Sequence, residues 1–197
     1  IVEVTKNGKR YQVPVPYDLC DITTTTEGIF LTEVVTKAAK NSTSVEPPEF
    51  IFANCELNKD IYPWGFLMIY PQNELLNDQN TLNRLRAKLY GMDNLIEKLI
   101  QNEYKNTSKV LGDFGIDLGE VEAGKPQILS VGEHAIVSQT LSTSTDGYSE
   151  KGINSGTVLD KMVFEYVIYD NKGKYGMDSR KAARSLASAG KLLKDLN

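Results

Sequence analysis

Two neighbouring stretches of this chain, residues 50–53 and 62–70, are apolar at nearly every position. A strand that is apolar on both faces needs cover on both, so these stretches predict central strands of a sheet lying between two further layers. The link between them is short and polar, which is typical of antiparallel neighbours. This pair constrains the fold more than any other feature of the sequence.

Three other stretches carry strand signals. Residues 128–141 and 158–169 are rich in strand-favouring side chains. Residues 10–16 also alternate, but Pro14 and Pro16 each remove a backbone donor, which places that strand at a sheet edge. Residues 142–156 hold almost no apolar side chain, so we expect a polar loop there, at the tip of a long hairpin.

Helices are predicted in three places. The threonines at 23–26 can cap a helix that ends near Asn41. Apolar residues at spacings of three and four predict a long amphipathic helix with a possible bend at Gly91; they are Leu82, Leu85, Leu89, Met92, Ile96 and Leu99. A last helix is capped by Asp178 or Ser179. Its small-residue face, suited to close packing on a sheet, consists of Ala183, Leu186, Gly190 and Leu193.

The predicted element order is β-α-β-β-α-β-β-α. Because hairpin neighbours outnumber crossovers, we expect an α+β fold with a largely antiparallel sheet of about five strands, covered by helices in an α/β/α sandwich. A length of 197 residues suits one domain, so residues 1–197 are predicted to fold as a single unit.

Charge and hydropathy argue against two classes of partner. The formal net charge is −4 and the basic residues are scattered, whereas nucleic-acid binding usually rests on a clustered positive surface. The longest apolar stretch, residues 66–70, is far shorter than the roughly 20 residues that a membrane-spanning helix needs. We therefore expect neither nucleic-acid binding nor a membrane span.

No catalytic motif is present in the sequence. His134 is the only histidine, which excludes zinc sites with several imidazoles, and the acids at 113, 117 and 120 do not match a calcium-binding loop. Neither a Gly-x-Ser-x-Gly elbow nor a phosphate-binding glycine loop occurs. We expect no catalysis, metal or cofactor. The alternative is an enzyme that uses Cys55 or Cys20 with His134.

An aromatic group on the second central strand allows two interpretations. The group consists of Tyr62, Trp64, Phe66 and Tyr70, which share one face of an extended strand. Tyrosine and tryptophan combine a stacking surface with a polar group, so this face can line a groove for a small molecule or lipid. The commoner outcome for such a face is burial beneath a helix.

The two cysteines, Cys20 and Cys55, also allow two interpretations. A disulfide between them places the protein in an oxidising compartment, whereas two buried thiols suit a cytoplasmic protein. The first residue is Ile1, which fits either a chain left after removal of a signal peptide or a shortened sequence.

Three short segments resemble an uncharacterised family of small exported (periplasmic) bacterial proteins. They are residues 13–20 (VPVPYDLC), residues 52–57 (FANCEL) and residues 166–170 (YVIYD), with a helix that closes the chain, so the resemblance covers nearly its full length. It implies export and a disulfide between Cys20 and Cys55. The element order is also similar to the Mog1/PsbP-like sandwich, whose members are mostly non-enzymatic binding or assembly subunits; this likeness is one of topology alone.

The sequence therefore predicts an exported bacterial protein, periplasmic or secreted, that binds a protein partner or small ligand without catalysis. A secreted effector is one form of this prediction. The alternatives are a cytoplasmic location, the cysteine–histidine enzyme, or a small-molecule or lipid carrier that uses the aromatic groove.

Overall fold

The computed structural model describes residues 1–197 except 17, 42–45, 58–60, 116–118, 146–148 and 172–177. Within these described residues the main sheet has eight strands in the order β3-β4-β5-β10-β9-β8-β6, and β7 also pairs with β8. All pairings are antiparallel. The strands are β3 (Leu19–Asp21), β4 (Phe50–Asn54), β5 (Trp64–Tyr70), β6 (Val121–Ala123), β7 (Gln127–Val131), β8 (Ile136–Ser144), β9 (Ser149–Leu159) and β10 (Met162–Asn171).

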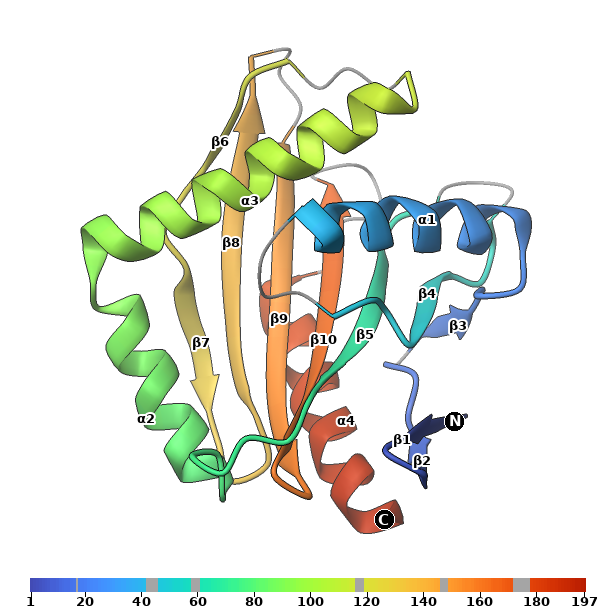
Figure 1. Ribbon diagram of the computed structural model, residues 1–197, viewed down its shortest axis with the longest axis vertical. Helices are drawn as coiled ribbons and strands as arrows, with labels where there is room; N and C mark the ends of the chain where they lie inside the picture. Colours follow the sequence, from blue (N-terminus) through green and yellow to red (C-terminus); the bar gives the residue numbers. More distant parts are fainter. Residues whose placement is uncertain (17, 42–45, 58–60, 116–118, 146–148, 172–177) are drawn as a thin grey trace.

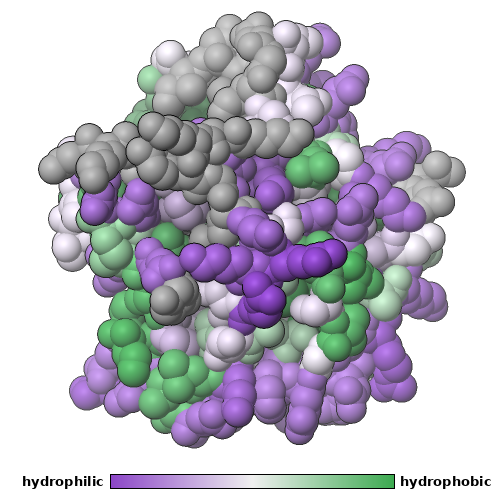
Figure 2. Space-filling model, turned by 180° about the vertical axis from the view of Figure 1, so that it is seen from behind, coloured by the Kyte–Doolittle hydropathy of each residue, from purple (hydrophilic) through white to green (hydrophobic). Residues whose placement is uncertain are grey.

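Helices cover both faces of this sheet (Figure 1). On one face lie α1 (Thr26–Asn41), α2 (Gln79–Tyr90) and α3 (Asp93–Asp113); on the other lie α4 (Ser179–Leu196) and a hairpin of β1 (Val2–Lys6) and β2 (Lys9–Val13). The antiparallel α+β arrangement is thus confirmed. Figure 2 shows the α4 side, where apolar side chains form separate patches among polar ones.

The predicted count of five strands and the predicted element order are both wrong. The structure has the order β-β-β-α-β-β-α-α-β-β-β-β-β-α. The short strands β3 and β6 have three residues each, too few to produce an alternating pattern in the sequence. The single strand predicted at 128–141 is divided by the turn at Gly132 into β7 and β8.

The polar stretch 142–156 is mostly strand and not the predicted loop. β8 runs to Ser144 and β9 starts at Ser149. Ser142 and Ser155 are buried, because strands on both sides pair with β9 and small hydroxyl side chains fit beneath the helices. The long hairpin tip predicted from polar composition is therefore wrong, because most of this stretch belongs to two polar strands. Residues 146–148 lie outside the described residues.

α4 forms as the sequence predicts. The Asp178 side chain accepts a hydrogen bond from the backbone N–H of Arg180 at 2.6 Å and caps the helix. The small-residue face is buried on the sheet, and a Cβ at Gly190 would lie only 2.5 Å from Oγ1 of Thr157. Glycine at 190 is thus what permits the close approach of α4 to β9.

The long helix predicted from leucine spacing is two helices that separate at Gly91, which confirms the bend. The N–H of Gly91 bonds to the carbonyl of Ala87 and closes α2, and α3 begins two residues later. The predicted apolar face is only partly buried, since Leu85, Met92 and Leu99 are about half exposed. α2 instead turns a largely polar face towards the sheet.

Gly65 of β5 is required by close packing. A Cβ at this position would lie 2.0 Å from the carbonyl oxygen of Val167 and 2.7 Å from the ring of Phe52. We expect Gly65→Ala to lower the free energy of unfolding by about 1–3 kcal/mol in urea denaturation, because backbone cannot move aside cheaply. The matched control is Gly112→Ala in α3, where a Cβ meets nothing within 4 Å and helix propensity favours alanine. Equal stability of the two variants would contradict this account.

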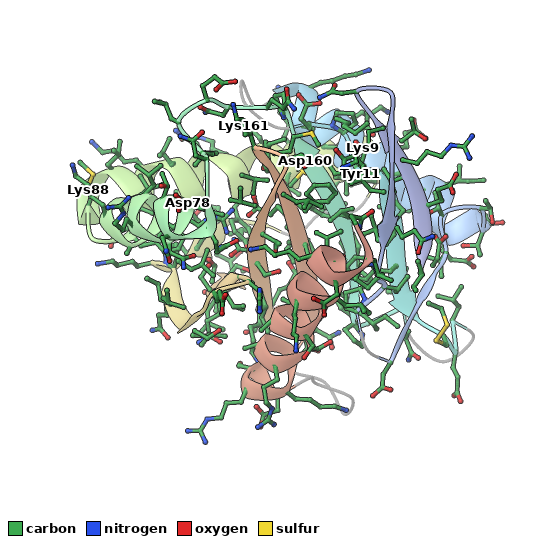
Figure 3. The ribbon with its side chains drawn as sticks, turned by 90° about the horizontal axis from the view of Figure 1, so that it is seen from below. Lys9, Tyr11, Asp78, Lys88, Asp160 and Lys161 are labelled. Atoms are coloured by element: carbon green, nitrogen blue, oxygen red, sulfur yellow. A yellow bond between two sulfur atoms is a disulfide. The ribbon has the colours of Figure 1, made fainter. Side chains whose placement is uncertain are left out.

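The β1–β2 hairpin is anchored to the turn between β9 and β10 (Figure 3). Asp160 lies in this turn, 2.6 Å from the Lys9 ammonium, and accepts a hydrogen bond of 2.8 Å from the Tyr11 hydroxyl. Burial and, to a smaller extent, the hydrogen bond to Asp160 raise the pKa of Tyr11 to about 12. The same two donors lower the pKa of Asp160 below its ordinary value.

These shifts predict a loss of stability at high pH. Folded Tyr11 holds its proton more tightly than unfolded tyrosine does. Its contribution to the free energy of unfolding is therefore complete below pH 10 and is lost as the pH rises through about 12. We expect this contribution to be roughly 1–2 kcal/mol, since the partly exposed Asp160 is screened by solvent. Urea midpoints of wild type and Tyr11→Phe between pH 9 and 12 should converge. A constant difference would refute the assignment.

Candidate functional site

The two faces of the central strand β10 are covered to different extents. Every residue that faces α4 from Met162 to Asp170 is buried, whereas Glu165, Val167 and Tyr169, which face the α1–α3 side, are only half-buried. Neighbouring Asn154 on β9 is half-buried as well. On the α1–α3 side, no helix crosses the middle of β9 and β10 in Figure 1, whereas α4 lies behind them. We call Asn154, Glu165, Val167 and Tyr169 the central strip.

Strand register arranges the strip in three rows. Val167 pairs with Asn154 on β9 and with Phe66 on β5, so the middle row joins an amide, an aliphatic side chain and an aromatic ring. Glu165 pairs with Gly156, and Tyr169 pairs with Gly152. Asn154 is therefore the one β9 side chain on this face between two glycines.

The two glycines leave space that other side chains fill. A Cβ at Gly156 would lie 2.8 Å from the guanidinium carbon of Arg86, which extends from α2 over the strand. A Cβ at Gly152 would lie 3.5 Å from the ring of Tyr169 and 3.6 Å from the hydroxyl oxygen of Tyr104 on α3. The glycines thus bring a cation and two tyrosines onto the sheet at either end of Asn154.

Arg86 and Glu165 form an ion pair at one end of the strip. Nη2 and Oε2 lie 2.9 Å apart, and the side chains are 13% and 12% exposed. Burial by itself would lower the pKa of Arg86, but the negative charge of Glu165, with smaller contributions from Tyr90 and Tyr70, raises it above its ordinary value. Arg86 therefore stays charged, and its formal charge balances that of Glu165. Nη1 of Arg86 is buried and makes no hydrogen bond with the described residues.

A hydrogen-bond chain orients Asn154. Oγ of Ser138, opposite Asn154 on β8, contacts both Oδ1 of Asn154 and the hydroxyl of Tyr90, at 3.3 Å from the latter. A serine hydroxyl has one hydrogen, and the amide oxygen can only accept, so Ser138 donates to Asn154 and the Tyr90 hydroxyl donates to Ser138. This order fixes Nδ2 of Asn154 on the opposite side from Ser138.

Gln79 and Asn83 attach α2 to the sheet beside the strip. The Gln79 side chain accepts a hydrogen bond from Val158 N–H at 2.9 Å and donates to the Gly156 carbonyl at 3.0 Å, as a neighbouring strand would. Gln79 also donates to Asn83, which in turn donates to the Gly132 carbonyl. With Arg86 and Tyr90 these residues recur at every third or fourth position and form the polar inner face of α2.

The members of the predicted aromatic group have different environments: Phe66 is buried beneath a helix, and Trp64 lies next to the strip. Phe66 is 6% exposed and packs against Leu31 and Val35 of α1. Trp64 and Tyr70 face the same side but are half-buried, and the Trp64 ring lies 4.9 Å from that of Tyr169. Tyr62 donates a hydrogen bond of 3.0 Å to Glu150. Burial beneath a helix thus holds for Phe66, while Trp64 adjoins the strip.

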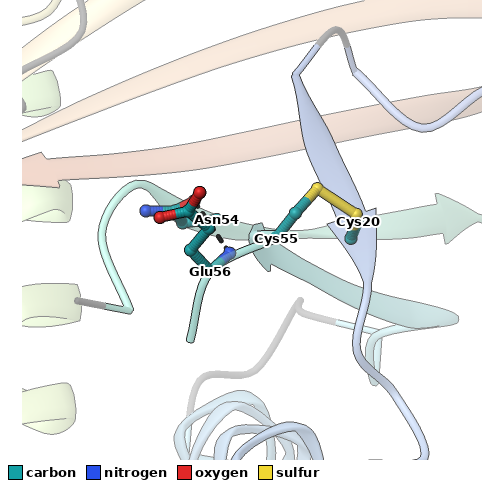
Figure 4. The surroundings of a disulfide bond; sticks show 4 residues. All are labelled: Cys20, Asn54, Cys55 and Glu56. Carbon is teal, nitrogen blue, oxygen red and sulfur yellow. Dashed lines mark hydrogen bonds between the residues drawn. A yellow bond between two sulfur atoms is a disulfide. The ribbon is translucent and has the colours of Figure 1, made fainter. Parts of the chain in front are cut away.

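The predicted disulfide between Cys20 and Cys55 is present (Figure 4). Cys20 lies on the edge strand β3, and Cys55 follows directly after β4, with 5.1 Å between the Cα atoms. Asn54 Oδ1 accepts a hydrogen bond from the N–H of Glu56 and supports the turn beyond the bond. Both cysteines are therefore in the oxidised state, as exported proteins commonly have them.

The structure does not bring His134 and the cysteines together. His134 directly precedes β8, four strands away from β4, which at about 4.8 Å per strand is roughly 19 Å from Cys55. Asp117 lies outside the described residues, and within the rest of the chain no three of the residues His, Cys, Asp and Glu gather as metal ligands would.

The central strip was not predicted from the sequence. The signal was available in Gly152 and Gly156, which flank Asn154 at alternate positions of a strand, but the polar composition there predicted a loop. Arg86 and Glu165 are 79 positions apart, so only the fold shows that they pair.

A hollow of about 210 Å³ lies beside β7 and β8. It is lined by Gly124, Lys125, Gln127, Gln139 and Leu141. Nε2 of Gln139 donates a hydrogen bond to Gln127, while Oε1 of Gln139 is buried without a partner among the described residues. No buried charge faces it among the described residues, and it is a weaker candidate than the strip.

Comparison with known proteins gives no relative: no protein-family model matches the chain, and no curated protein matches it. Within the part of the chain that the structure describes, no helix is both long and apolar enough to cross a membrane.

Proposed function

We propose that this chain is an exported bacterial protein, periplasmic or secreted, that binds a small ligand on the central strip without catalysis. The observation that carries the proposal is the incomplete cover of β10: Glu165, Val167 and Tyr169 stay half-buried in the middle of an eight-stranded sheet. Ligand sites are lined by aromatic and other apolar side chains with a few oriented polar groups, and the strip combines both kinds.

Export is supported by the disulfide between Cys20 and Cys55. Such bonds persist in oxidising compartments and are rare in the cytoplasm, where thiols are kept reduced. The resemblance of three sequence segments to exported proteins points the same way.

The absence of catalysis is supported by the chemistry of the strip. Arg86 and Glu165 neutralise each other, and the Ser138 hydroxyl donates its hydrogen to the Asn154 amide, so it is not activated by a base. A general base or nucleophile needs an unpaired, activated group. These groups can hold and orient a ligand.

Trapping of free thiols in intact cells tests export. The cells that make the protein are treated with a membrane-permeant alkylating agent before lysis, and the peptides are then analysed without reduction. We expect Cys20 and Cys55 to be joined and unmodified. Alkylation of both cysteines would overturn the export proposal.

Equilibrium dialysis tests binding on the strip. The protein is dialysed against a small-molecule extract of the same cells, and retained compounds are identified by mass spectrometry. We expect at least one compound to be retained unchanged by wild type and by Asn80→Leu, a substitution at an exposed position of α2, but not by Asn154→Leu. Chemical conversion of the compound, or equal retention by both variants, would contradict a non-catalytic site on the strip.

A further inference from the structure

We infer that the central strip binds a neutral, polyhydroxylated ligand, a mono- or disaccharide, with its hydroxyl groups between Asn154 and Glu165 and its C–H face against Val167 and the Trp64–Tyr169 pair. This inference rests on the proposed function and names the class of ligand for the same site.

Charge balance selects a neutral ligand. The Arg86 guanidinium and the Glu165 carboxylate lie 2.9 Å apart and sum to zero, so the site has no charge left for a ligand ion to balance. An anion on the strip would meet the Glu165 carboxylate, and a cation would displace Arg86 from it. Either would have to give up its hydration without a compensating partner.

The polar groups of the strip include a donor and an acceptor. Asn154 uses Oδ1 to accept from Ser138, and its Nδ2 donates no hydrogen bond to the described residues. Glu165 meets Arg86 through Oε2, and its second oxygen, Oε1, has no hydrogen bond with the described residues. A hydroxyl group both donates and accepts, so a polyol can satisfy both residues at once.

Their spacing suits one sugar ring. Glu165 and Asn154 lie diagonally on adjacent strands, since Glu165 pairs with Gly156 and Asn154 pairs with Val167. Diagonal neighbours are about 7 Å apart at the backbone, which hydroxyl groups on opposite sides of a six-membered ring can bridge. Arg86 occupies the room over Gly156, and Tyr104 and Tyr169 that over Gly152, so the ring would lie over Asn154 and Val167.

Aromatic and aliphatic groups lie along the same rows. The rings of Trp64 and Tyr169 are 4.9 Å apart on adjacent strands, and Val167 lies between Tyr169 and Glu165 on β10. The C–H face of a sugar packs on such surfaces. A wholly apolar lipid would instead dehydrate Nδ2 of Asn154 and Oε1 of Glu165 without giving either atom a partner.

Isothermal titration calorimetry with a defined panel tests the inference. Neutral probes are glucose, maltose and N-acetylglucosamine; charged probes are glucuronic acid and glucosamine; N-acetylglycinamide represents a neutral amide without hydroxyl groups. We expect saturable binding of at least one neutral sugar and at least tenfold weaker binding of the charged analogues and the amide. Trp64, the only tryptophan, should report the same binding by fluorescence.

Two variants locate the binding on the strip. Asn154→Leu should weaken the sugar about tenfold or more, because it removes the amide donor, while Asn80→Leu repeats the substitution at an exposed position of α2 and should have no effect. Asn154→Asp removes the donor with the shape retained, so it decides the outcome if the leucine variant unfolds.

The outcomes separate the inference from the proposed function. The saccharide class is overturned if a charged probe or the amide binds more tightly than every sugar. It is also overturned if no sugar binds. If dialysis then still retains another compound that Asn154→Leu loses, binding on the strip stands and only its ligand class falls. If nothing is retained in either experiment, both fall.

Discussion

Replacement of Glu165 by glutamine is expected to lower the free energy of unfolding by about 3–5 kcal/mol. The substitution keeps the shape of the side chain but leaves the Arg86 guanidinium, 13% exposed and packed on Gly156, without an opposite charge. The matched control is Glu33→Gln on α1. It removes an i,i+4 ion pair with Lys37 whose side chains are about half exposed, and it should cost less than 1 kcal/mol.

Urea denaturation of the two variants at neutral pH measures the difference. The double variant Arg86→Met/Glu165→Leu completes the test, because it removes both charges and should recover much of the loss. A cost for Glu165→Gln within about 1 kcal/mol of that for Glu33→Gln would show that solvent reaches Arg86 freely. The description of the strip as half-buried would then be wrong.

The expected recovery in the double variant bears on why the pair is there. Apolar residues of similar volume stabilise a core at least as well as a buried ion pair does. The fold therefore has no need of Arg86 and Glu165 for stability alone. The proposed ligand site on the strip, where Glu165 and Asn154 are diagonal neighbours, would account for two charges in the middle of a sheet.

Elements with strong local signals were predictable. β4 and β5 are apolar on both faces and form the antiparallel pair that was expected, with Phe66 opposite Ile51. α4 begins at the predicted cap, Asp178, and buries the predicted face. In both cases the residues that decide the structure are neighbours in sequence, so the pattern of one segment contains the information.

Elements that depend on distant partners were not predictable. β9 is polar over its first half, and only the strands on both sides of it, β8 and β10, explain why Ser149–Leu159 is extended. α2 turns Gln79 and Asn83 inward because backbone groups of β9 and of Gly132 need partners there. Leucine spacing predicted a different face, of which Leu82 is buried but Leu85 is exposed, since hydropathy alone ignores such hydrogen bonds.

The disulfide provides the second large effect. The double variant Cys20→Ala/Cys55→Ala is expected to lose about 3–4 kcal/mol of unfolding free energy, because the bond closes a loop across a sequence separation of 35 and so restricts the unfolded chain. Oxidised wild type, wild type with a reducing agent and the double variant are compared by urea denaturation. The two forms without the bond should agree with each other.

The comparison also tests the connection between stability and compartment. The disulfide joins β3 to the end of β4 at the edge of the sheet, far from Arg86 and Glu165. The unfolding free energy lost with the disulfide and that lost in Glu165→Gln should therefore be additive within about 0.5 kcal/mol when the changes are combined. Equal stability of reduced and oxidised wild type would mean that β3 stays in place without the bond. The protein would then have no need of an oxidising compartment to fold, and the strongest structural support for export would be lost.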